Sequence, residues 1–257
     1  MSSVEAGVVD LSGRVVLVTG GSRGIGAACV RALHRAGGQV FFTYRERETE
    51  AETLRRELGE NVEAYRLDLA DGAALPGAVE ACVAHFGGLD VLVNNAAIFA
   101  ENPFDGDDYA AWRAGWRRTF AVNLFGAADL AWLAMRAMRA RGEGAIVNIA
   151  SRAAHRGELS FADYGASKAA LVNLTKSIAR SCAREGIVAV AVAPGFVATE
   201  MAAADLAAHG DAIAAEIPLG RVASADEVAH VVAFLCTPLA RHLNGATIDV
   251  NGGSYVR

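Results

Sequence analysis

The fold of this 257-residue chain is decided by residues 14–26, which read RVVLVTGGSRGIG. The run from Arg14 to Thr19 is short, apolar and β-branched, which is typical of a buried strand. After the glycines, an Ala- and Leu-rich stretch to Gly37 predicts a helix. A strand that leads through glycines into a helix is a setting for phosphate binding. Small residues admit a pyrophosphate there, and free N–H groups at the helix N-terminus meet its charge.

The glycines of this turn follow the spacing G-x-x-x-G-x-G, at Gly20, Gly24 and Gly26. This differs from the G-x-G-x-x-G of most dinucleotide folds, and from the phosphate loop of nucleoside triphosphatases, which needs Gly-Lys-Ser/Thr. A turn that needs glycine only for its geometry would explain the same residues. Taken alone, the motif indicates phosphate binding without establishing it.

The same alternation of strand and helix continues along the chain. Further strands are predicted at residues 39–44, 61–67, 89–94, 144–150, 187–193 and 246–250, and further helices at 45–57, 73–86, 109–141, 161–185 and 225–236. We therefore expect an α/β, Rossmann-type doubly wound parallel sheet of about seven strands with helices on both faces, in three layers. The Ala-rich stretch from Glu200 to Ile217 looks mobile and predicts no element. Since no linker, repeat or low-complexity tail is visible, residues 1–257 are expected to form one dinucleotide-binding domain that also holds the catalytic site.

Polar residues stand at the ends of the predicted strands, where parallel sheets bind ligands. The second strand ends in Tyr44-Arg45, at the position that faces the adenosine ribose in dinucleotide folds. A carboxylate there would bind the ribose hydroxyls and repel a 2′-phosphate, whereas a guanidinium pairs with phosphate. Arg45, with Arg23 in the glycine turn, therefore favours NADP(H) over NAD(H). The alternative is that Arg45 only opens the charged helix that follows.

Composition and charge argue against several other classes of protein. The net charge of −5 gives no reason to expect nucleic acid or an anionic membrane as a partner. Residues Met1 to Asp10 lack the basic start and apolar run of a secretory leader, and no apolar stretch approaches the ~20 residues of a bilayer span. The four cysteines are scattered singly, and the six histidines show no metal-ligand spacing. We expect a cytoplasmic protein without a metal site.

A candidate acid/base pair stands in the stretch Asp163-Tyr164-Gly165-Ala166-Ser167-Lys168. In a helix, Tyr164 and Lys168 leave the same face because they are four residues apart. An ammonium held beside a phenol favours the phenolate, so we expect the pKa of Tyr164 to lie below its reference of about 10. Such a phenol could give or take a proton near neutral pH. A surface tyrosine and a solvated lysine are the plainer explanation of this spacing.

Several motifs, taken in order, closely resemble the short-chain dehydrogenase/reductase family over nearly the whole chain, residues 13–253. They are Thr19-Gly20-x-x-x-Gly24-x-Gly26, Asn94-Asn95-Ala96, Asn123, Ser151, Tyr164-x-x-x-Lys168 and Pro194-Gly195. Within the family, residues 194–201 and 245–253 look most like the bacterial 3-oxoacyl-[acyl-carrier-protein] reductases. Many members with other substrates share those two stretches.

The resemblance implies a role for each matching residue. Tyr164 would be the general acid/base, and Lys168 would lower its pKa and hold the nicotinamide ribose. Ser151 would hydrogen-bond the substrate oxygen, and Asn123 would fix a water that completes a proton relay. The remaining matches would bind the cofactor: Gly20, Ser22, Arg23, Gly24, Ile25 and Gly26 at the phosphates, Asp68 and Leu69 at the adenine, Asn95, Ala96 and Ala97 beside the ribose, and Pro194, Gly195, Val197 and Thr199 on the nicotinamide side.

The resemblance also favours a 3-oxoacyl thioester as substrate and makes an acyl carrier protein a candidate partner. Two departures weaken that assignment: the usual Asn-Asn-Ala-Gly ends in Ala97, and the interval from Ala97 to Asn123 is a few residues longer, around residues 101–113. A sugar, polyol, steroid-like or secondary-metabolite carbonyl is the alternative substrate. A non-catalytic NADP(H)-binding sensor is an alternative of another class. Because the family usually forms tetramers through its two long helices, we expect a homotetramer.

Two groups of basic residues have alternative explanations. A cationic patch for an acidic carrier protein could be formed by Arg136, Arg139, Arg141, Arg180 and Arg184. Solvated ends of long helices would explain the same residues. His155 and Arg156 lie in a segment that typically borders the substrate in this family. They could sense a substrate carboxylate or phosphate, or His155 could be a structural loop residue.

Overall fold

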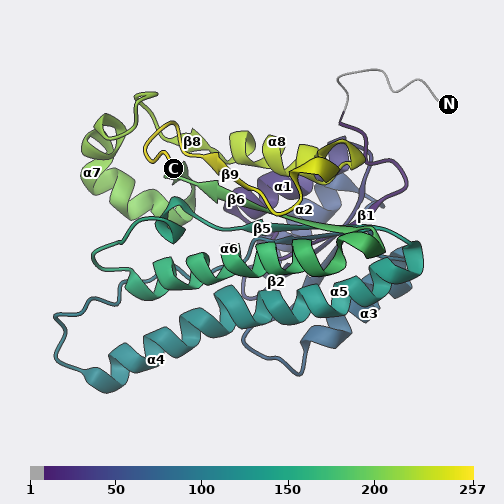
Figure 1. The fold of residues 1–257 in the computed structure, drawn as a ribbon, viewed down its shortest axis with the longest axis horizontal. Coiled ribbons are helices and arrows are strands. Elements are labelled where there is room, and N and C mark those ends of the chain that lie inside the picture. Colours follow the sequence, from purple (N-terminus) through teal and green to yellow (C-terminus); the bar gives the residue numbers. More distant parts are fainter. Residues whose placement is uncertain (1–8) are drawn as a thin grey trace.

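A seven-stranded sheet, with every pairing parallel, forms the centre of the computed structural model, which describes residues 9–257 (Figure 1). The strands lie in the order β3-β2-β1-β4-β5-β6-β9, which confirms the predicted fold class. Their bounds are β1 Val15–Val18, β2 Gln39–Tyr44, β3 Val62–Arg66, β4 Val91–Asn94, β5 Gly144–Ile149, β6 Ile187–Pro194 and β9 Thr247–Val250. The order reverses between β1 and β4, so the carboxyl ends of these two strands flank the crevice where such sheets bind ligands. The prediction for Met1–Asp10 lies almost wholly outside the described residues.

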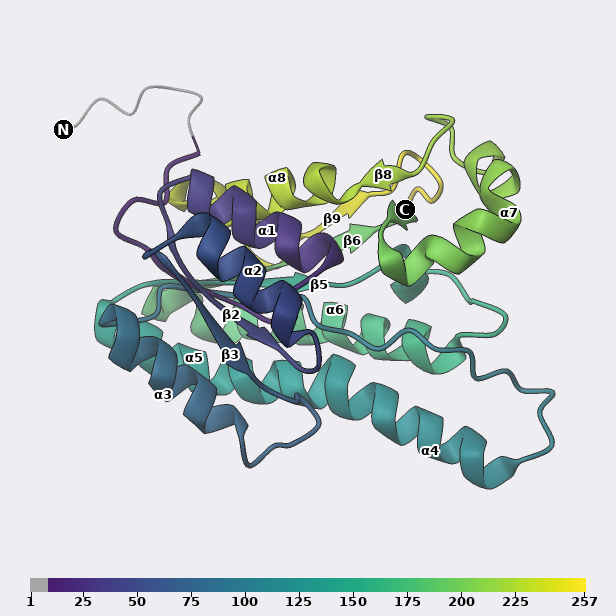
Figure 2. The ribbon, with the colours of Figure 1, turned by 180° about the vertical axis from the view of Figure 1, so that it is seen from behind.

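Helices cover both faces of the sheet, as expected for a parallel sheet whose central strands are apolar on both sides. Along β1, Val16 and Val18 pack into one hydrophobic core, and Val15 and Leu17 into the opposite one. Helices α1, α2 and α8 lie over the first face, and α3, α5 and α6 over the second (Figures 1 and 2). The helix bounds are α1 Gly24–Arg35, α2 Glu48–Leu58, α3 Leu75–Phe86, α4 Tyr109–Phe120, α5 Ala127–Arg141, α6 Ala162–Cys182, α7 Ala203–Ala215 and α8 Ala225–Leu235.

The long helix predicted for residues 109–141 is interrupted near its middle, at Asn123. Between α4 and α5, residues Ala121–Gly126 form a π-helical turn that contains the buried Asn123. Its side-chain amide accepts a hydrogen bond from the Ile98 N–H at 2.7 Å and donates to the Ile98 carbonyl at 3.0 Å. The wider turn therefore aims Asn123 at the segment that follows β4, and that segment supplies the partners a buried amide needs.

The prediction of no element between Glu200 and Ile217 was wrong. This stretch holds α7, and a short parallel pair, β7 Val197–Ala198 with β8 Ala223–Ser224, also lies outside the predicted elements. Alanine has the highest helix propensity, but only Ile213 of α7 is buried, so the apolar periodicity that reveals a helix is missing. The remaining single-turn elements are η2 Arg152–Ala154, η3 Ala183–Glu185, η4 Glu200–Ala202 and η5 Pro238–Leu243.

The other predicted boundaries agree with the structure to within three residues. None of the helices in residues 9–257 combines the length and the apolar character that a membrane crossing requires. All four cysteines are buried and unpaired. In the same described part of the chain, no group of three His, Cys, Asp or Glu residues is arranged to hold a metal ion.

Candidate active site

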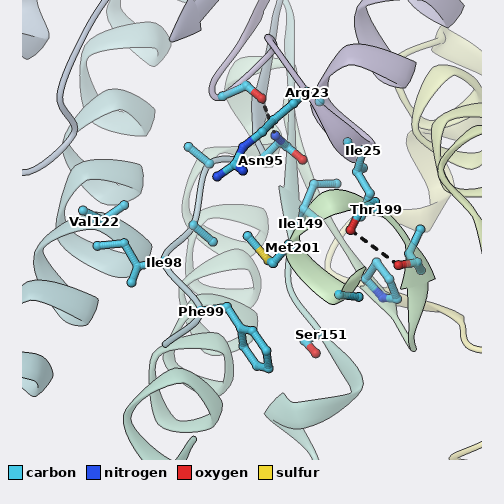
Figure 3. A pocket seen from close by; sticks show the side chains of 18 of the residues that line it. Arg23, Ile25, Asn95, Ile98, Phe99, Val122, Ile149, Ser151, Thr199 and Met201 are labelled. Carbon is cyan, nitrogen blue, oxygen red and sulfur yellow. Dashed lines mark hydrogen bonds between the residues drawn. The ribbon is translucent and has the colours of Figure 1, made fainter. Parts of the chain in front are cut away.

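A cavity of about 570 Å³ opens at the carboxyl ends of the parallel strands (Figure 3). It is lined by every residue predicted to bind the cofactor, from Gly20 in the glycine turn to Thr199 beyond β6, and by Ser151. Asn123 is the one predicted catalytic residue outside the lining. The sequence did not single out several further lining residues: Arg47, Phe99, Arg152, Phe161, Phe196 and Met201.

The glycine turn is shaped as a cradle that no larger residue could form. Gly20 and Gly24 have φ angles of +67° and +53°, which side-chain-bearing residues rarely adopt. A Cβ atom at Gly26 would lie 2.0 Å from the carbonyl oxygen of Gly20. Helix α1 begins at Gly24 without a side-chain cap, so its first N–H groups remain free to meet an anion. These features fit the pyrophosphate of a dinucleotide.

Thr19 and Asn95 fasten this cradle to the end of β4. The Thr19 hydroxyl accepts hydrogen bonds from the backbone N–H groups of Asn95 at 2.9 Å and Ala96 at 3.0 Å. The Asn95 side-chain amide donates to the carbonyls of Thr19 at 2.8 Å and Gly20 at 3.1 Å. Asn95, expected beside the cofactor ribose, thus also holds the glycine turn in place. No such role for Thr19 was predicted from the sequence.

A cluster of guanidinium groups stands at the adenosine end of the cavity. Arg23 and Arg45 were predicted there, and Arg47 joins them. Glu200, from η4, lies 3.5 Å from both Arg23 and Arg47, while Arg45 pairs with Glu46 at 2.7 Å. The side chains of the three arginines are only half-buried, so an incoming anion can reach them. The sequence signal for Arg47 was available, since it lies two residues beyond Arg45 in the same charged run.

The first turn of α6 is fixed by Asp163, which is buried. One carboxylate oxygen accepts from the Tyr164 N–H at 2.8 Å. The other accepts from the Thr119 hydroxyl of α4 at 2.8 Å and from the Asn102 amide at 3.3 Å. The carboxylate also sits favourably at the positive end of the helix dipole. Asp163 therefore positions Tyr164 relative to α4.

Tyr164 and Lys168 lie on one face of α6 and both line the cavity, as predicted. Lys168 is only 2% exposed, and its ammonium donates to the carbonyl of Ile149 at 2.6 Å. Its Nζ lies 5.6 Å from the centroid of the Tyr164 ring. The Lys168 side chain thus points toward the end of β5, and its ammonium lies over the ring of Tyr164.

The prediction that Lys168 lowers the pKa of Tyr164 was wrong for the protein without ligand. Burial raises the pKa of Tyr164 to about 12, and a hydrogen bond from Ser151 acts in the opposite direction. Burial also lowers the pKa of Lys168 to about 7. Lys168 is therefore only partly charged near neutral pH. The cost of burying a Tyr164 phenolate outweighs the attraction between that phenolate and the lysine.

Ser151 follows β5 and caps the η2 turn. Its Oγ accepts a hydrogen bond from the Ala153 N–H at 3.1 Å. The hydroxyl proton remains available, and it can be donated to Tyr164 or to a substrate oxygen. This arrangement suits a group that stabilises a developing negative charge.

Asn123 supports the acid/base pair from outside the cavity. Its amide donates to the Ser167 hydroxyl at 3.1 Å, and Ser167 donates to the backbone carbonyl of Tyr164 at 2.7 Å. These contacts tie the π-helical turn to the helix that carries Tyr164. The role of Asn123 in a water-linked proton relay stays a prediction.

Comparisons with known proteins place this architecture among nucleotide-dependent reductases. A family model described as enoyl-(acyl carrier protein) reductase matches residues 20–255. The chain is 35% identical to the 3-oxoacyl-[acyl-carrier-protein] reductase of Vibrio cholerae, over 96% of this chain and 100% of that protein. It is 36% identical to the acetoacetyl-CoA reductase of Rhizobium meliloti, over 94% of this chain and 98% of the relative.

Two solved structures have the same fold over nearly their whole length. The short-chain dehydrogenase/reductase from Brucella melitensis, titled a glucose/ribitol dehydrogenase, superposes with a TM-score of 0.91 at 32% identity, covering 98% of this chain and 100% of that one. A short-chain dehydrogenase from Burkholderia cenocepacia, solved in complex with NADP, gives a TM-score of 0.88 at 36% identity, covering 95% and 98%.

The buried Lys168 predicts a specific pH dependence of stability for the protein without cofactor. The folded state releases the Lys168 proton near pH 7, whereas the unfolded chain keeps it until about pH 10.5. The folded state therefore binds fewer protons in this window, and its stability increases with pH. We expect the free energy of unfolding to rise by about 1 kcal/mol from pH 7 to 8. Urea unfolding at the two pH values measures it.

Lys168→Met should flatten this rise, whereas Lys176→Met, which removes an exposed lysine from the same helix, should leave it unchanged. The comparison stops at pH 8 because burial raises the thiol pKa of Cys29, Cys82 and Cys236 above the value in the unfolded chain. Those groups make stability fall at higher pH. An equal rise in wild type and Lys168→Met would contradict the assignment.

Proposed function

The chain belongs to the short-chain dehydrogenase/reductase family of oxidoreductases, and on this premise we propose that it transfers hydride between NADP(H) and a ketone or secondary alcohol. The observation that carries the proposal is the meeting of Ser151, Tyr164 and Lys168 on one wall of the cavity whose opposite end is the glycine cradle. A dinucleotide that spans the cavity would have its phosphates at Gly20–Gly26 and its nicotinamide beside the phenol.

The proposed chemistry divides between cofactor and protein. Bound NADPH supplies the hydride, and the protein supplies position and electrostatics. Ser151 donates a hydrogen bond to the carbonyl oxygen, and Tyr164 gives that oxygen its proton. A phenol whose pKa is raised to about 12 is protonated at neutral pH, which suits the acid in the direction of reduction. Lys168, with a pKa of about 7, can give up or accept a proton at neutral pH.

The preference for NADP(H) rests on the three arginines at the adenosine end. Arg23, Arg45 and Arg47 bring three guanidinium groups to the place where the ribose 2′-phosphate would lie. The Burkholderia cenocepacia relative was solved with NADP, which supports the same choice. A cofactor without that phosphate would leave this cluster with the carboxylates of Glu46, Glu50 and Glu200 as its partners.

A 3-oxoacyl thioester is the favoured substrate. The Vibrio cholerae and Rhizobium meliloti relatives, a 3-oxoacyl-[acyl-carrier-protein] reductase and an acetoacetyl-CoA reductase, support this class. The Brucella melitensis structure, titled a glucose/ribitol dehydrogenase, keeps a sugar or polyol open as the second class. An acyl carrier protein has weak support as a partner, because Arg139 pairs with Glu185 and Arg141 pairs with Asp90 at 3.0 Å. A sensor without activity is disfavoured by the presence of the complete catalytic set.

Tyr164→Phe tests the reaction itself. Removing the phenol oxygen removes the proton donor, so NADPH oxidation with a panel of ketones and acetoacetyl thioesters should fall by about 100-fold or more. The dissociation constant for NADPH should change by less than about threefold, because the cradle is untouched. Absorbance at the reduced-nicotinamide band follows turnover, and fluorescence titration follows binding. Undiminished turnover in this variant would refute the mechanism.

Arg47→Gln tests the cofactor assignment, with Arg45→Gln beside it. We expect each variant to weaken NADPH binding by about tenfold and NADH binding by less than about threefold, because only NADPH carries the 2′-phosphate. The matched control is Arg56→Gln on α2, whose side chain is exposed and does not line the cavity. A wild type that binds NADH more tightly than NADPH would show the assignment to be wrong.

We further propose a homotetramer that associates through the long helices. Two aromatic side chains on this face are exposed, Phe125 at 59% and Trp132 at 55%. Arg136 stacks on the outer face of Trp132, 5.0 Å from the ring centroid. Large exposed aromatic groups about two turns apart along a helix are typical of an association surface.

Trp132→Lys should break this assembly, since a charge in the centre of an apolar interface is costly. Light scattering after gel filtration should give the mass of four chains for the wild type and of fewer chains for the variant. Leu159→Lys, at a loop residue that is also exposed to solvent but lies outside the long helices, should keep the wild-type mass. A monomeric wild type would exclude the proposed assembly.

A further inference from the structure

Arg152 is a buried cation in the wall of the proposed active site. It follows Ser151 directly, in the η2 turn, and it lines the cavity. Only 4% of the residue is exposed, and its Nη1 atom is sealed from solvent without a hydrogen-bond partner. Arginine is rarely buried unless it is paired. The residue therefore needs an explanation that packing alone does not give.

Within residues 9–257, no carboxylate lies at ion-pair distance from Arg152, and its guanidinium makes no hydrogen bond. Glu158, which also lines the cavity, is engaged by Arg156 at 3.4 Å. Glu158 and Glu216 act on Arg152 only at longer range. Burial lowers the pKa of Arg152, and the nearby charge of Arg156 lowers it further. The protein thus holds a desolvated positive charge without a counterion.

The aromatic ring of Phe196 holds the guanidinium in place. The Arg152 Cζ atom lies 4.8 Å from the ring centroid. Phe196 belongs to the loop after β6, which begins with Pro194-Gly195 and faces the nicotinamide end of the cavity. A cation over an aromatic face is stabilised, but the ring supplies no negative charge and no acceptor for Nη1. Arg152 is therefore positioned between Ser151 and this loop, and its guanidinium has neither a hydrogen-bond acceptor nor an ion-pair partner in the described residues.

We propose that Arg152 binds a carboxylate of the substrate, so that the enzyme reduces an oxo acid in preference to a neutral thioester. The inference rests on the proposed ketone reductase function, and it places a free 3-oxo acid ahead of the 3-oxoacyl thioester that the names of the relatives favour. A carboxylate satisfies both needs of the site, since it compensates the charge and accepts two parallel hydrogen bonds from a guanidinium. The carbonyl of a thioester would accept one hydrogen bond and leave the charge unpaired. Because Ser151 and Arg152 line the same cavity, one small molecule that carries both a ketone and a carboxylate, such as a 3-oxo acid, can be tested against both side chains.

The first test compares 3-oxobutanoate with its methyl ester and with acetoacetyl-CoA, using the wild-type enzyme and NADPH. We expect kcat/KM for the acid to exceed that for the ester by at least about tenfold. Arg152→Gln should lower kcat/KM for the acid by about 30-fold or more, mainly through KM, and change the ester by less than about threefold. Arg152→Lys should restore part of the activity toward the acid. Arg180→Gln is the matched control, since Arg180 is exposed on α6 and lies outside the cavity lining, and it should keep the wild-type preference.

The second test measures binding without turnover. Butanoate, but not butanamide, should raise the melting temperature of the NADPH-loaded wild type, and Arg152→Gln should lose this difference. A wild type that prefers the ester or the thioester overturns the proposal, and so does an equal loss for acid and ester in Arg152→Gln. The wild-type comparisons decide the question even if the variant does not fold. Butanoate binding through Arg152 without turnover of any ketone would refute the reductase function and leave the anion site standing.

Discussion

The hydrogen bond from the buried Lys168 ammonium to the carbonyl of Ile149 fixes the geometry on which the candidate site depends. A buried ammonium must find its partner inside the protein, so this bond sets how far α6 slides along β5. Ile149 lies two residues before Ser151, and Lys168 lies one turn after Tyr164. The bond between Lys168 and Ile149 therefore brings the Ser151 hydroxyl and the Tyr164 phenol close together. Farther along the same interface, Asn148 donates to the Thr175 hydroxyl at 2.8 Å and keeps helix and strand in that register.

The surroundings of Tyr164 explain why its proton is held tightly. The ring of Phe99 meets Tyr164 edge-on, with centroids 4.9 Å apart, and stacks on Phe161 at 4.1 Å. This aromatic wall removes water that would stabilise a phenolate, whereas the lysine that could compensate is itself desolvated. Positive charge is instead concentrated at the two ends of the cavity, at the arginine cluster around Arg45 and at Arg152. Guanidinium groups at these two places can pair with the phosphates of a cofactor and with the carboxylate of an acidic substrate.

The sequence predicted the parts of this architecture that repeat or that admit few alternatives. Buried parallel strands reveal themselves as apolar runs, and Gly26 is required because any side chain there would collide with the Gly20 carbonyl. Burial is different, because it is a property of the assembled protein. The raised pKa of Tyr164 and the isolation of Arg152 depend on side chains that are distant in sequence. Helix α7 was not predicted for a related reason, since an exposed Ala-rich helix shows no apolar periodicity in its sequence.

The π-helical turn at Ala121–Gly126 makes one short segment of the chain intolerant of changes in length. One residue more or less in a helix rotates everything beyond it by about 100°, since each turn holds 3.6 residues. Deleting a residue here would straighten the rod but swing Leu130, Ala134 and Met138 of α5 off the sheet they cover. The loop at residues 99–108, which precedes α4, is not helical, so its length does not set the rotation of a helix face. Insertions between β4 and α4 can therefore be tolerated in the loop. The number of residues between Asn123 and the buried residues of α5 cannot change without moving those residues off the sheet.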